Sequence, residues 1–266
     1  LATSSAASDV YKRQVVGQRP ARVGCYTSPH LVHFSERIRV DGVSADEQTI
    51  CDALAQVDEA RFHVDGPDLA ASEPISLTYF EFTTLAALLI FKQAELDYWV
   101  LEVGLGGRLD AVNIVDADVS VITNIDIDHQ GWLGDTRECI AIEKAGIARK
   151  GRPLVIGDDN PPSTLIDEIA RLGAHPIWLA DALDTDNALS VHGVQLDSGN
   201  SCLWQGVDRR GVRIERRFAL SACQHYEGVW SNLSSAVQAY VLLTGQMPSG
   251  EQLEHVVAQP VLGRLS

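Results

Sequence analysis

Short apolar runs that alternate with helical segments are the feature that most constrains the fold of this chain. Tyr98–Leu101 and Pro153–Ile156 are continuous apolar runs, and Asp118–Ile125 contains the mostly apolar string VSVITNI. Runs of this kind are typical of strands that are buried on both faces. Residues 80–93, before the first run, and 137–149, between the second and third, have helical spacing. The alternation predicts an α/β fold with a doubly wound, mostly parallel sheet.

The flanking segments predict further elements and a small antiparallel β portion. We expect strands at residues 22–26 and 38–40, helices at 46–61 and 163–172, and a polar loop at 62–73. Beyond Ile177, polar alternation predicts antiparallel strands at 191–196 and 211–220. A helix is expected at 231–243, with Ser231 and Asn232 as its N-terminal caps, and a short one at 251–257.

The composition is that of an acidic globular chain. Of the 266 residues, 45% are hydrophobic and 21% are charged, and the formal net charge is −15. Such a surface repels nucleic acid, which we therefore exclude as a partner. A nucleoside triphosphate is also anionic, so its binding requires a local patch of metal, lysine, arginine or backbone N–H groups. The longest apolar run, Leu85–Phe91, is far shorter than the ~20 residues that span a bilayer, so no membrane partner is expected.

Cysteine usage and the N-terminal sequence indicate the compartment. The five cysteines include no CxxC pair, which favours free thiols in a reducing cytoplasm, each as a small buried residue. No basic region followed by an apolar core opens the chain, so we expect no secretory signal. Residues 1–21 include an Ala- and Ser-rich stretch without a period, and we expect a disordered or foreign head there.

Polar side chains follow three of the predicted strands. Ser28 follows the strand at 22–26, Glu102 follows Tyr98–Leu101, and His129 follows Asp118–Ile125. Ligands bind at the carboxyl ends of strands in an open parallel sheet, so these three groups can converge on one cation. Mg²⁺ takes one or two protein oxygens, whereas a histidine ligand also suits Mn²⁺. Alternatively, Ser28 is only a turn residue and His129 is only a loop residue. Glu102 is different, because a lone buried carboxylate needs a cation partner.

Two other segments allow both a structural and a functional interpretation. Gly104–Leu109 is not a dinucleotide fingerprint, because Leu109 takes the place of the third glycine, and this argues against a dinucleotide-dependent oxidoreductase. The glycines still allow the backbone to approach a ligand closely. Lys144 lies on a predicted helix, where a lysine is usually a solvated surface residue, and the alternative is that it points at a metal or phosphate site.

Five ordered motifs resemble one family. They are YTSPHL at 26–31, TYFEF at 78–82, LEVGLGGRLDA at 101–111, Asp128-His129 with WLG at 132–134, and EKAGI at 143–147. Together they resemble the dihydrofolate/folylpolyglutamate synthases, which belong to the Mur ligase superfamily. The resemblance is strong from Arg22 to Asp158 and weaker from there to Ser266. It implies the central ATP-binding domain of a Mur ligase over residues 22–266.

The resemblance implies an ATP-dependent amide-bond ligase that is cytoplasmic and monomeric. ATP would phosphorylate a carboxylate of dihydropteroate or tetrahydrofolate, and the amino group of L-glutamate would attack the acyl phosphate. The resemblance implies one or two Mg²⁺ ions bound by Ser28, Glu102 and His129. It implies His129 and a carbamylated Lys144 as catalytic groups. The substrate contacts would be Thr78, Tyr79, Phe80, Glu81, Leu109, Asp110 and Ala111. The ATP contacts would be Asn232 and Arg264.

The chain also departs from the family pattern. The family has a glycine-rich phosphate loop before TSPHL, whereas no GK[ST] occurs anywhere in this sequence. The family's C-terminal glutamate-binding domain is also not represented. We therefore expect a fragment whose parent is a folate ligase. The alternatives are another Mur-type ligase, such as a peptidoglycan UDP-MurNAc amino-acid ligase, or an inactive truncated fragment.

Overall fold

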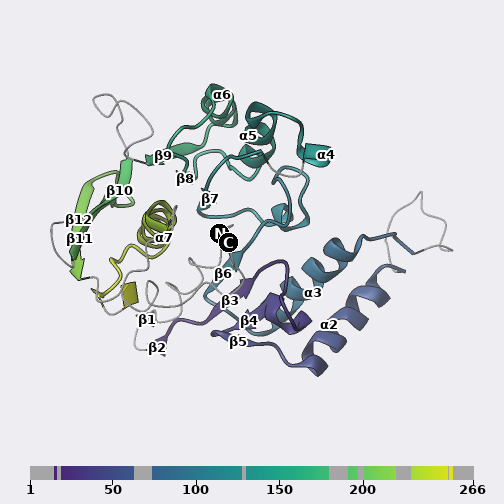
Figure 1. The fold of residues 1–266 in the computed structure, drawn as a ribbon. Helices are drawn as coiled ribbons and strands as arrows, with labels where there is room; N and C mark the ends of the chain where they lie inside the picture. Colours follow the sequence, from purple (N-terminus) through teal and green to yellow (C-terminus); the bar gives the residue numbers. More distant parts are fainter. Residues whose placement is uncertain are drawn as a thin grey trace.

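A computed structural model describes most of the chain (Figure 1). The described residues are 15–16, 19–62, 74–127, 130–179, 191–196, 201–219, 229–250 and 252–253. They form two sheets and one short hairpin of β1 (Val15–Val16) with β2 (Arg19–Pro20). The predicted head at 1–21 and the short helix at 251–257 lie mostly outside the described residues.

The first sheet has the strand order β5-β4-β3-β6. Its strands are β3 (Val23–Tyr26), β4 (Ile38–Val40), β5 (Val43–Ser44) and β6 (Tyr98–Leu101). β3 pairs in parallel with β6 and antiparallel with β4. Two helices, α2 (Glu47–Ala60) and α3 (Tyr79–Gln93), pack with this sheet, and their apolar side chains share one core with Tyr26 and Ile38.

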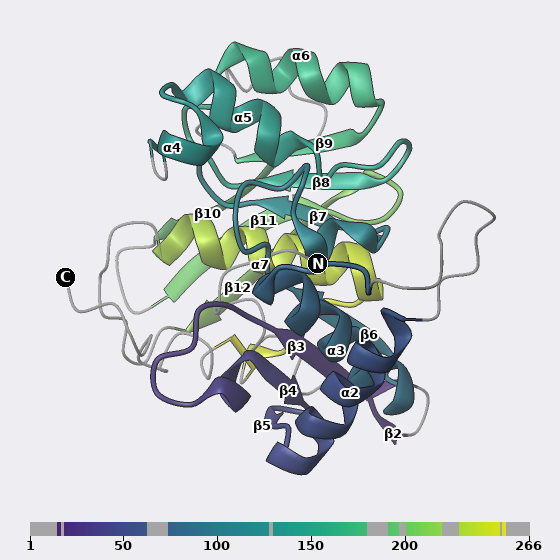
Figure 2. The same cartoon turned by 90° about the vertical axis from the view of Figure 1, so that its right-hand side faces the viewer.

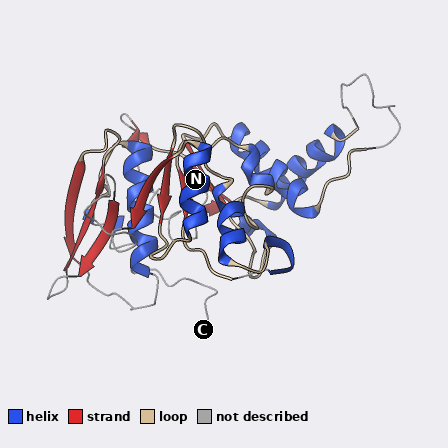
Figure 3. Cartoon of the chain, turned by 90° about the horizontal axis from the view of Figure 1, so that it is seen from above, coloured by secondary structure: helices blue, strands red, loops and turns tan. Residues whose placement is uncertain are grey.

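The second sheet has the order β12-β11-β10-β9-β8-β7. Its strands are β7 (Ser120–Ile122), β8 (Pro153–Ile156), β9 (His175–Leu179), β10 (Val191–Leu196), β11 (Ser201–Val207) and β12 (Arg213–Ala219). From β7 to β10 the pairing is parallel, and from β10 to β12 it is antiparallel. In Figure 3 the antiparallel strands lie at the end of the molecule opposite to the helices of the first sheet.

Helices cover both faces of the parallel strands. Figure 2 shows α5 (Arg137–Ala145) and α6 (Ser163–Leu172) on one side and α7 (Val229–Thr244) on the other. Successive strand residues point to opposite faces, so on β8 Leu154 and Ile156 pack with α5 and α6, while Val155 packs with α7. This is the doubly covered α/β arrangement that the alternation of strands and helices predicts. Three shorter helices, η2 (Phe34–Arg37), η3 (Ala111–Ile114) and α4 (Gln130–Leu133), lie in the connections.

Several predicted boundaries need correction. α7 begins at Val229, so Ser231 and Asn232 lie inside the helix and are not its caps. α5 ends at Ala145 rather than at 149, and the following Gly146 packs directly against Arg108. The sequence did not predict β9 or β11, whose strings HPIWL and SCLWQGV mix proline, glycine and polar residues with apolar ones. Among the described helices, none is both long and apolar enough to cross a membrane.

The described cysteines are free thiols, as predicted. Cys25 and Cys202 are buried small residues. Cys51 and Cys139 are exposed, so the expectation of burial was wrong for them. Cys51 lies on α2 and Cys139 on α5, on faces of these helices that do not pack against a sheet. Cys223 lies outside the described residues.

Candidate functional site

Ser28 and Glu102 meet where β3 and β6 end. The two strands are parallel and in register, with Tyr26 opposite Leu101, so the residues that follow them lie side by side. The N–H of Ser28 donates to a carboxylate oxygen of Glu102 at 2.8 Å, and the N–H of Glu102 donates to the carbonyl of Tyr26 at 2.9 Å. The structure therefore places these two residues side by side, in contact through the Ser28 backbone.

The surroundings of Glu102 suit a bound cation. Burial raises the pKa of Glu102 from 4.5 to about 7, and the Ser28 N–H only partly opposes this shift. A divalent ion beside the carboxylate would favour its charged form and relieve that cost. Within the described ranges, no group of three or more His, Cys, Asp or Glu residues forms a metal site. His129, the expected third ligand, lies outside them.

The loop that carries Ser28 is held by two neighbouring residues of η2. The carboxylate of Glu36 accepts the backbone N–H groups of Leu31, Val32 and His33 at 2.7–3.0 Å. These hydrogen bonds lower the pKa of Glu36 to about 2, and the one from His33 has the largest effect. Next to it, Arg37 donates from Nε to Nδ1 of His30 at 2.8 Å. The sequence analysis missed both residues, because nothing in the string FSER marks them as supports of the preceding loop.

The glycine turn after Glu102 packs closely on the end of α5. A Cβ on Gly107 would come within 2.8 Å of the carbonyl oxygen of Glu143, and one on Gly146 within 2.6 Å of the Cα of Arg108. Arg108 also forms an ion pair with the Glu143 carboxylate at 2.7 Å. The sequence suggested a close approach of this backbone to a ligand. In the structure, Gly107 and Gly146 allow a close approach between the turn and the end of α5.

Lys144 points toward the carboxyl end of β7. Its Nζ donates to the carbonyl oxygen of Asn124 at 2.7 Å, two residues beyond the last residue of that strand. The side chain is only half-buried, but its hydrogen bond directs it to the edge of the sheet where ligands bind in α/β folds. The placement favours the functional interpretation of Lys144 over that of a solvated surface residue.

The segment that follows β7 is fixed by a buried ion pair. Asp158 is 4% exposed and accepts the N–H of Ile125 at 2.5 Å. Arg137 donates to the carbonyl of Ile125 at 2.7 Å and pairs with Asp158 at 3.2 Å. The two side chains therefore hold the chain three residues before Asp128-His129. No sequence motif pointed to this pair.

Four of the expected substrate contacts lie at the start of α3. Thr78 and Glu81 cap the helix, since the Glu81 carboxylate accepts both the N–H and the hydroxyl of Thr78 at 2.7 Å. Their Thr-x-x-Glu spacing is a capping-box signal that the sequence analysis did not use. The ring of Phe80 covers Gly104 in the glycine turn. Tyr79 is 60% exposed.

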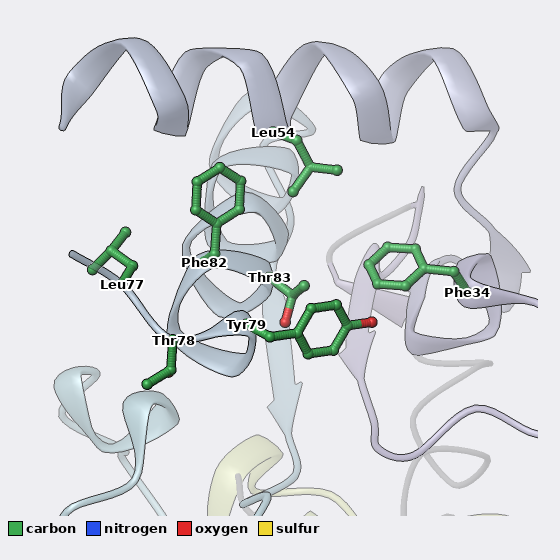
Figure 4. Close-up of a pocket in the computed structure, with 7 residues that line it drawn as sticks. All are labelled: Phe34, Leu54, Leu77, Thr78, Tyr79, Phe82 and Thr83. Atoms are coloured by element: carbon green, nitrogen blue, oxygen red, sulfur yellow. The ribbon is translucent and has the colours of Figure 1, made fainter. Parts of the chain in front are cut away.

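A cavity of about 470 Å³ opens beside the start of α3 (Figure 4). Figure 4 shows the rings of Phe34, Tyr79 and Phe82 with Thr83 around it, and Leu54 reaches it from α2. Its walls are mostly apolar, and aromatic rings supply much of their area. Such a cavity suits a flat, partly aromatic ligand. Of the expected substrate contacts, Thr78 and Tyr79 line it.

The remaining expected substrate contacts surround the glycine turn. Asp110 accepts the N–H groups of Gly104 and Leu105 with one oxygen and that of Val112 with the other, at 2.9–3.0 Å. Its pKa is raised, because burial outweighs these hydrogen bonds. Leu109 is 80% exposed, which leaves its apolar side chain accessible to a ligand. Ala111 begins η3.

The first turns of α7 lie at the carboxyl end of β8. His192 of β10 is fully buried. Its Nδ1 forms a hydrogen bond with the Ser234 hydroxyl at 2.8 Å, and its Nε2 forms one with the carbonyl of Ile156 at 2.9 Å. A Cβ on Gly157, just after β8, would come close to Ser235. Asn232 precedes these serines in the first turn of α7. Arg264 lies outside the described residues.

The fold and these residues define an α/β protein with a ligand site at the carboxyl ends of its parallel strands. Residues 50–203 match the Mur ligase middle domain. This match covers more than half of the chain, so the chain belongs to the Mur ligase family.

Individual relatives are bacterial folate enzymes. The dihydrofolate synthase/folylpolyglutamate synthase of Haemophilus influenzae is 51% identical over 151 residues, which make up 57% of this chain and 32% of that protein. The Escherichia coli protein of the same name is 50% identical over 153 residues, covering 58% of this chain and 34% of that protein. This chain therefore spans about a third of the length of these relatives.

Solved structures of the same enzyme class have the same fold. E. coli FolC in complex with ADP has a TM-score of 0.73 and 35% identity, over 97% of this chain and 54% of that chain. The bifunctional folylpolyglutamate synthase/dihydrofolate synthase of Yersinia pestis, complexed with AMPPNP and a Mn ion, also has a TM-score of 0.73. It is 33% identical over 100% of this chain and 58% of that chain.

Proposed function

We propose that this chain is the central part of an ATP-dependent ligase that adds L-glutamate to dihydropteroate and to tetrahydrofolate through an acyl phosphate. The proposal rests on the contact between Ser28 and Glu102 at the ends of β3 and β6. This contact joins the Ser28 backbone N–H to a desolvated carboxylate at the ligand edge of the sheet, so the residue that carries the hydroxyl lies next to Glu102. The relatives' names, and the nucleotide complexes solved for them, support the same reaction class.

In this proposal Ser28, Glu102 and His129 bind the divalent metal, with Mg²⁺ as one or two ions. The metal, when bound, neutralises the charge of the transferring phosphate. Glu102 contributes a carboxylate, and the cation lowers its pKa from the raised value of about 7. Lys144, which reaches the carboxyl end of β7, is the residue we propose to be carbamylated. Asn232 and Arg264 are the proposed ATP contacts.

The proposed substrate contacts form two groups at the start of α3. Thr78 and Tyr79 face the aromatic cavity, whereas Phe80 lies on the glycine turn that leads to Leu109, Asp110 and Ala111. Glu81 shapes this region by capping the helix. A pterin ring and its benzoate are flat and aromatic, and a site of this kind suits them. A complex solved with the E. coli enzyme contains ADP and DHPP, which supports a pterin-type substrate.

We propose further that residues 22–266 act as the central ATP-binding domain of a monomeric cytoplasmic enzyme with no nucleic-acid partner. The free thiols among the described cysteines and the net charge of −15 support this. Size-exclusion chromatography with light scattering tests the monomer. A mass of twice 28.9 kDa would contradict it.

Calorimetry of this chain with Mg-ATP and with Mn-AMPPNP tests the nucleotide site. Micromolar binding supports the ligase and excludes an inactive chain, and no binding at millimolar nucleotide favours the inactive fragment. Glu102→Gln should weaken Mn²⁺ binding by about tenfold or more, because the amide carries no charge for the metal. Glu47→Gln, at the exposed start of α2, is the matched control and should bind as before.

The substrate is tested with the intact gene. Expression in cells that lack dihydrofolate synthase should restore growth without added folate end products. Failure to restore growth, together with ligation of an amino acid to a UDP-MurNAc acceptor in vitro, would assign the protein to a peptidoglycan ligase instead.

A further inference from the structure

Arg37 holds the Ser28 loop at two points. It is the last residue of η2 and is 8% exposed. Its carbonyl oxygen accepts the N–H of Thr27 at 2.9 Å, and its Nε donates to Nδ1 of His30 at 2.8 Å. Thr27 and His30 flank Ser28 and Pro29 on either side. One residue therefore fixes both ends of the short segment that presents the Ser28 hydroxyl.

The same side chain reaches the start of α3. Its guanidinium carbon lies 5.6 Å from the ring centroid of Tyr79 and 6.0 Å from that of Phe34. The two rings are 6.4 Å apart and meet edge to face. Both rings line the aromatic cavity (Figure 4). Guanidinium groups stack favourably on such rings, so Arg37 connects the Ser28 loop to the wall of the cavity.

Stability alone does not account for an arginine at this position. Among the residues that the structure describes, no carboxylate forms an ion pair with Arg37. A buried cation without a counter-ion is costly, and an apolar side chain of similar volume would often fill such a place at least as well. What an apolar side chain cannot supply is the hydrogen bond to His30 together with the ring contacts.

We propose that Arg37 is a positioning residue that couples Ser28 at the metal site to Tyr79 at the substrate cavity. The proposal rests on the proposed function for the identity of the two sites. Arg37 sets the distance between the metal-binding hydroxyl and the ring that contacts the carboxylic-acid substrate. It touches neither the metal nor the reacting atoms, and its effect reaches them through Thr27, His30 and Tyr79.

Hydrogen exchange of the Ser28 amide, followed by NMR, tests the anchoring directly. Arg37→Met should speed this exchange by about tenfold, because the loop loses its bond to the η2 side chain. Arg61→Met is the matched control. Arg61 also stacks 5.6 Å over a ring of the same cavity, that of Phe82, but has no bond to the Ser28 loop among the described contacts. Equal exchange in the Arg37→Met variant and the unchanged chain would overturn the proposal.

Arg37→Lys covers the case in which the methionine variant does not fold. Lysine keeps the charge, but its compact ammonium group cannot donate a hydrogen bond to His30 and stack on the two rings at the same time. We therefore expect exchange of the Ser28 amide at a rate between those of the unchanged chain and Arg37→Met. Exchange identical to that of the unchanged chain, in a folded Arg37→Lys variant, would refute the positioning role.

The coupling to Tyr79 needs a second measurement. Tyr79→Leu should also speed the exchange of the Ser28 amide, and adding it to Arg37→Met should cause no further increase. Independent, additive effects would show that the two residues are not coupled.

Mg²⁺, which is diamagnetic and leaves the Ser28 signal visible, provides a readout that a purely structural role would not move. The Mg²⁺ concentration that half-protects the Ser28 amide should rise about fivefold in Arg37→Met and less than twofold in Arg61→Met, at matched melting temperatures. An equal shift in both variants would refute the proposal. If Mg²⁺ fails to protect this amide in the unchanged chain, the proposed metal site fails. The faster exchange of Arg37→Met would then still support the anchoring.

Discussion

At the scale of single residues, the partly buried Glu102 and the fully buried His192 have opposite effects on how stability depends on pH. Burial raises the pKa of Glu102 to about 7 and lowers the pKa of His192 to about 4. Both shifts favour the neutral form, because a low-dielectric interior penalises charge. The carboxylate is therefore costly at high pH, and the imidazolium is costly at low pH.

The first prediction concerns Glu102 in the absence of divalent metal. Its folded pKa lies above its unfolded value of 4.5, so the fold loses stability as the pH rises from 4.5 through 7. Glu102→Gln keeps the shape and remains neutral. We expect the variant to exceed the unchanged chain by about 1–3 kcal/mol in unfolding free energy at pH 8, and to match it at pH 4. Urea titrations at both pH values measure this difference, and a constant difference would contradict the assignment.

The second prediction concerns His192, for which the sign is reversed. Its folded pKa lies below the unfolded value of 6.5, so its contribution is complete above pH 6.5 and is lost as the pH falls toward 4. We expect this residue to add a slope of about 1.4 kcal/mol per pH unit over that range. His192→Gln should remove the slope, whereas the exposed His175→Gln should retain it. A slope that persists in His192→Gln would show that other groups cause it.

The sequence predicted neighbouring residues where chemistry and position coincide. The proximity of Ser28 and Glu102 was predictable, because each follows an apolar strand at the carboxyl end of the sheet. Arg37 and Arg137 were not, since their roles depend on partners that are distant in the chain or on the geometry of one loop. Single-sequence patterns contain periodicity and order but not these contacts.

At the scale of elements, long apolar segments were predictable and short mixed ones were not. α3 and α6 agree with their predicted ranges to within one residue, because helical spacing persists over three turns or more. β9 was missed because it opens with His-Pro and has only three buried residues. β11 alternates in burial, but it carries Leu203 on its less buried face and Gly206 on its buried face, so the sequence does not show the alternation. The start of α7 was misplaced because Ser231 and Asn232 are good caps in isolation, yet the helix continues through them.

The third prediction tests the contact between the glycine turn and α5. Gly146 has φ −60° and ψ −10°, which alanine adopts without strain, so only the contact with Arg108 opposes the change. We expect Gly146→Ala to lower the unfolding free energy by about 1–3 kcal/mol, because the turn must move away from the helix. Thermal denaturation measures this loss.

The control for Gly146 is Gly131 in α4. A Cβ added there meets nothing within 4 Å, and alanine favours helix over glycine. Gly131→Ala should therefore leave the melting temperature unchanged or raise it slightly. If both alanine variants lower it equally, the close packing of the turn on α5 is not what stabilises this region.

At the scale of the whole molecule, one core joins the two sheets. Val23 and Val100 of the first sheet belong to the same buried cluster as Val121 and Val155 of the second. Residues of α7 complete this cluster, and α7 lies against the parallel strands of the second sheet. The strands of the two sheets do not pair with each other among the described residues, so side-chain packing is what connects them. Ser28 and Glu102 follow strands of the first sheet, whereas Lys144 and Asn232 lie on helices that pack on the second, so the proposed site requires this connection.

The fourth prediction follows from the shared core: the two sheets should unfold together. Trp99 packs on Phe91 beside the first sheet, and Trp204 is fully buried in the second. With fluorotryptophan incorporated, each ring gives its own ¹⁹F signal, and Trp99→Phe and Trp204→Phe identify the two. We expect both signals to lose their native positions at the same urea concentration. Trp99 packs with the core of the first sheet, but its neighbour Val100 lies in the shared core with Trp204, and elements joined by one core open as one unit. If the Trp99 signal changes at a clearly lower concentration, the sheets are separate folding units. The residues that we propose to share one ligand would then be held together only when that ligand is bound.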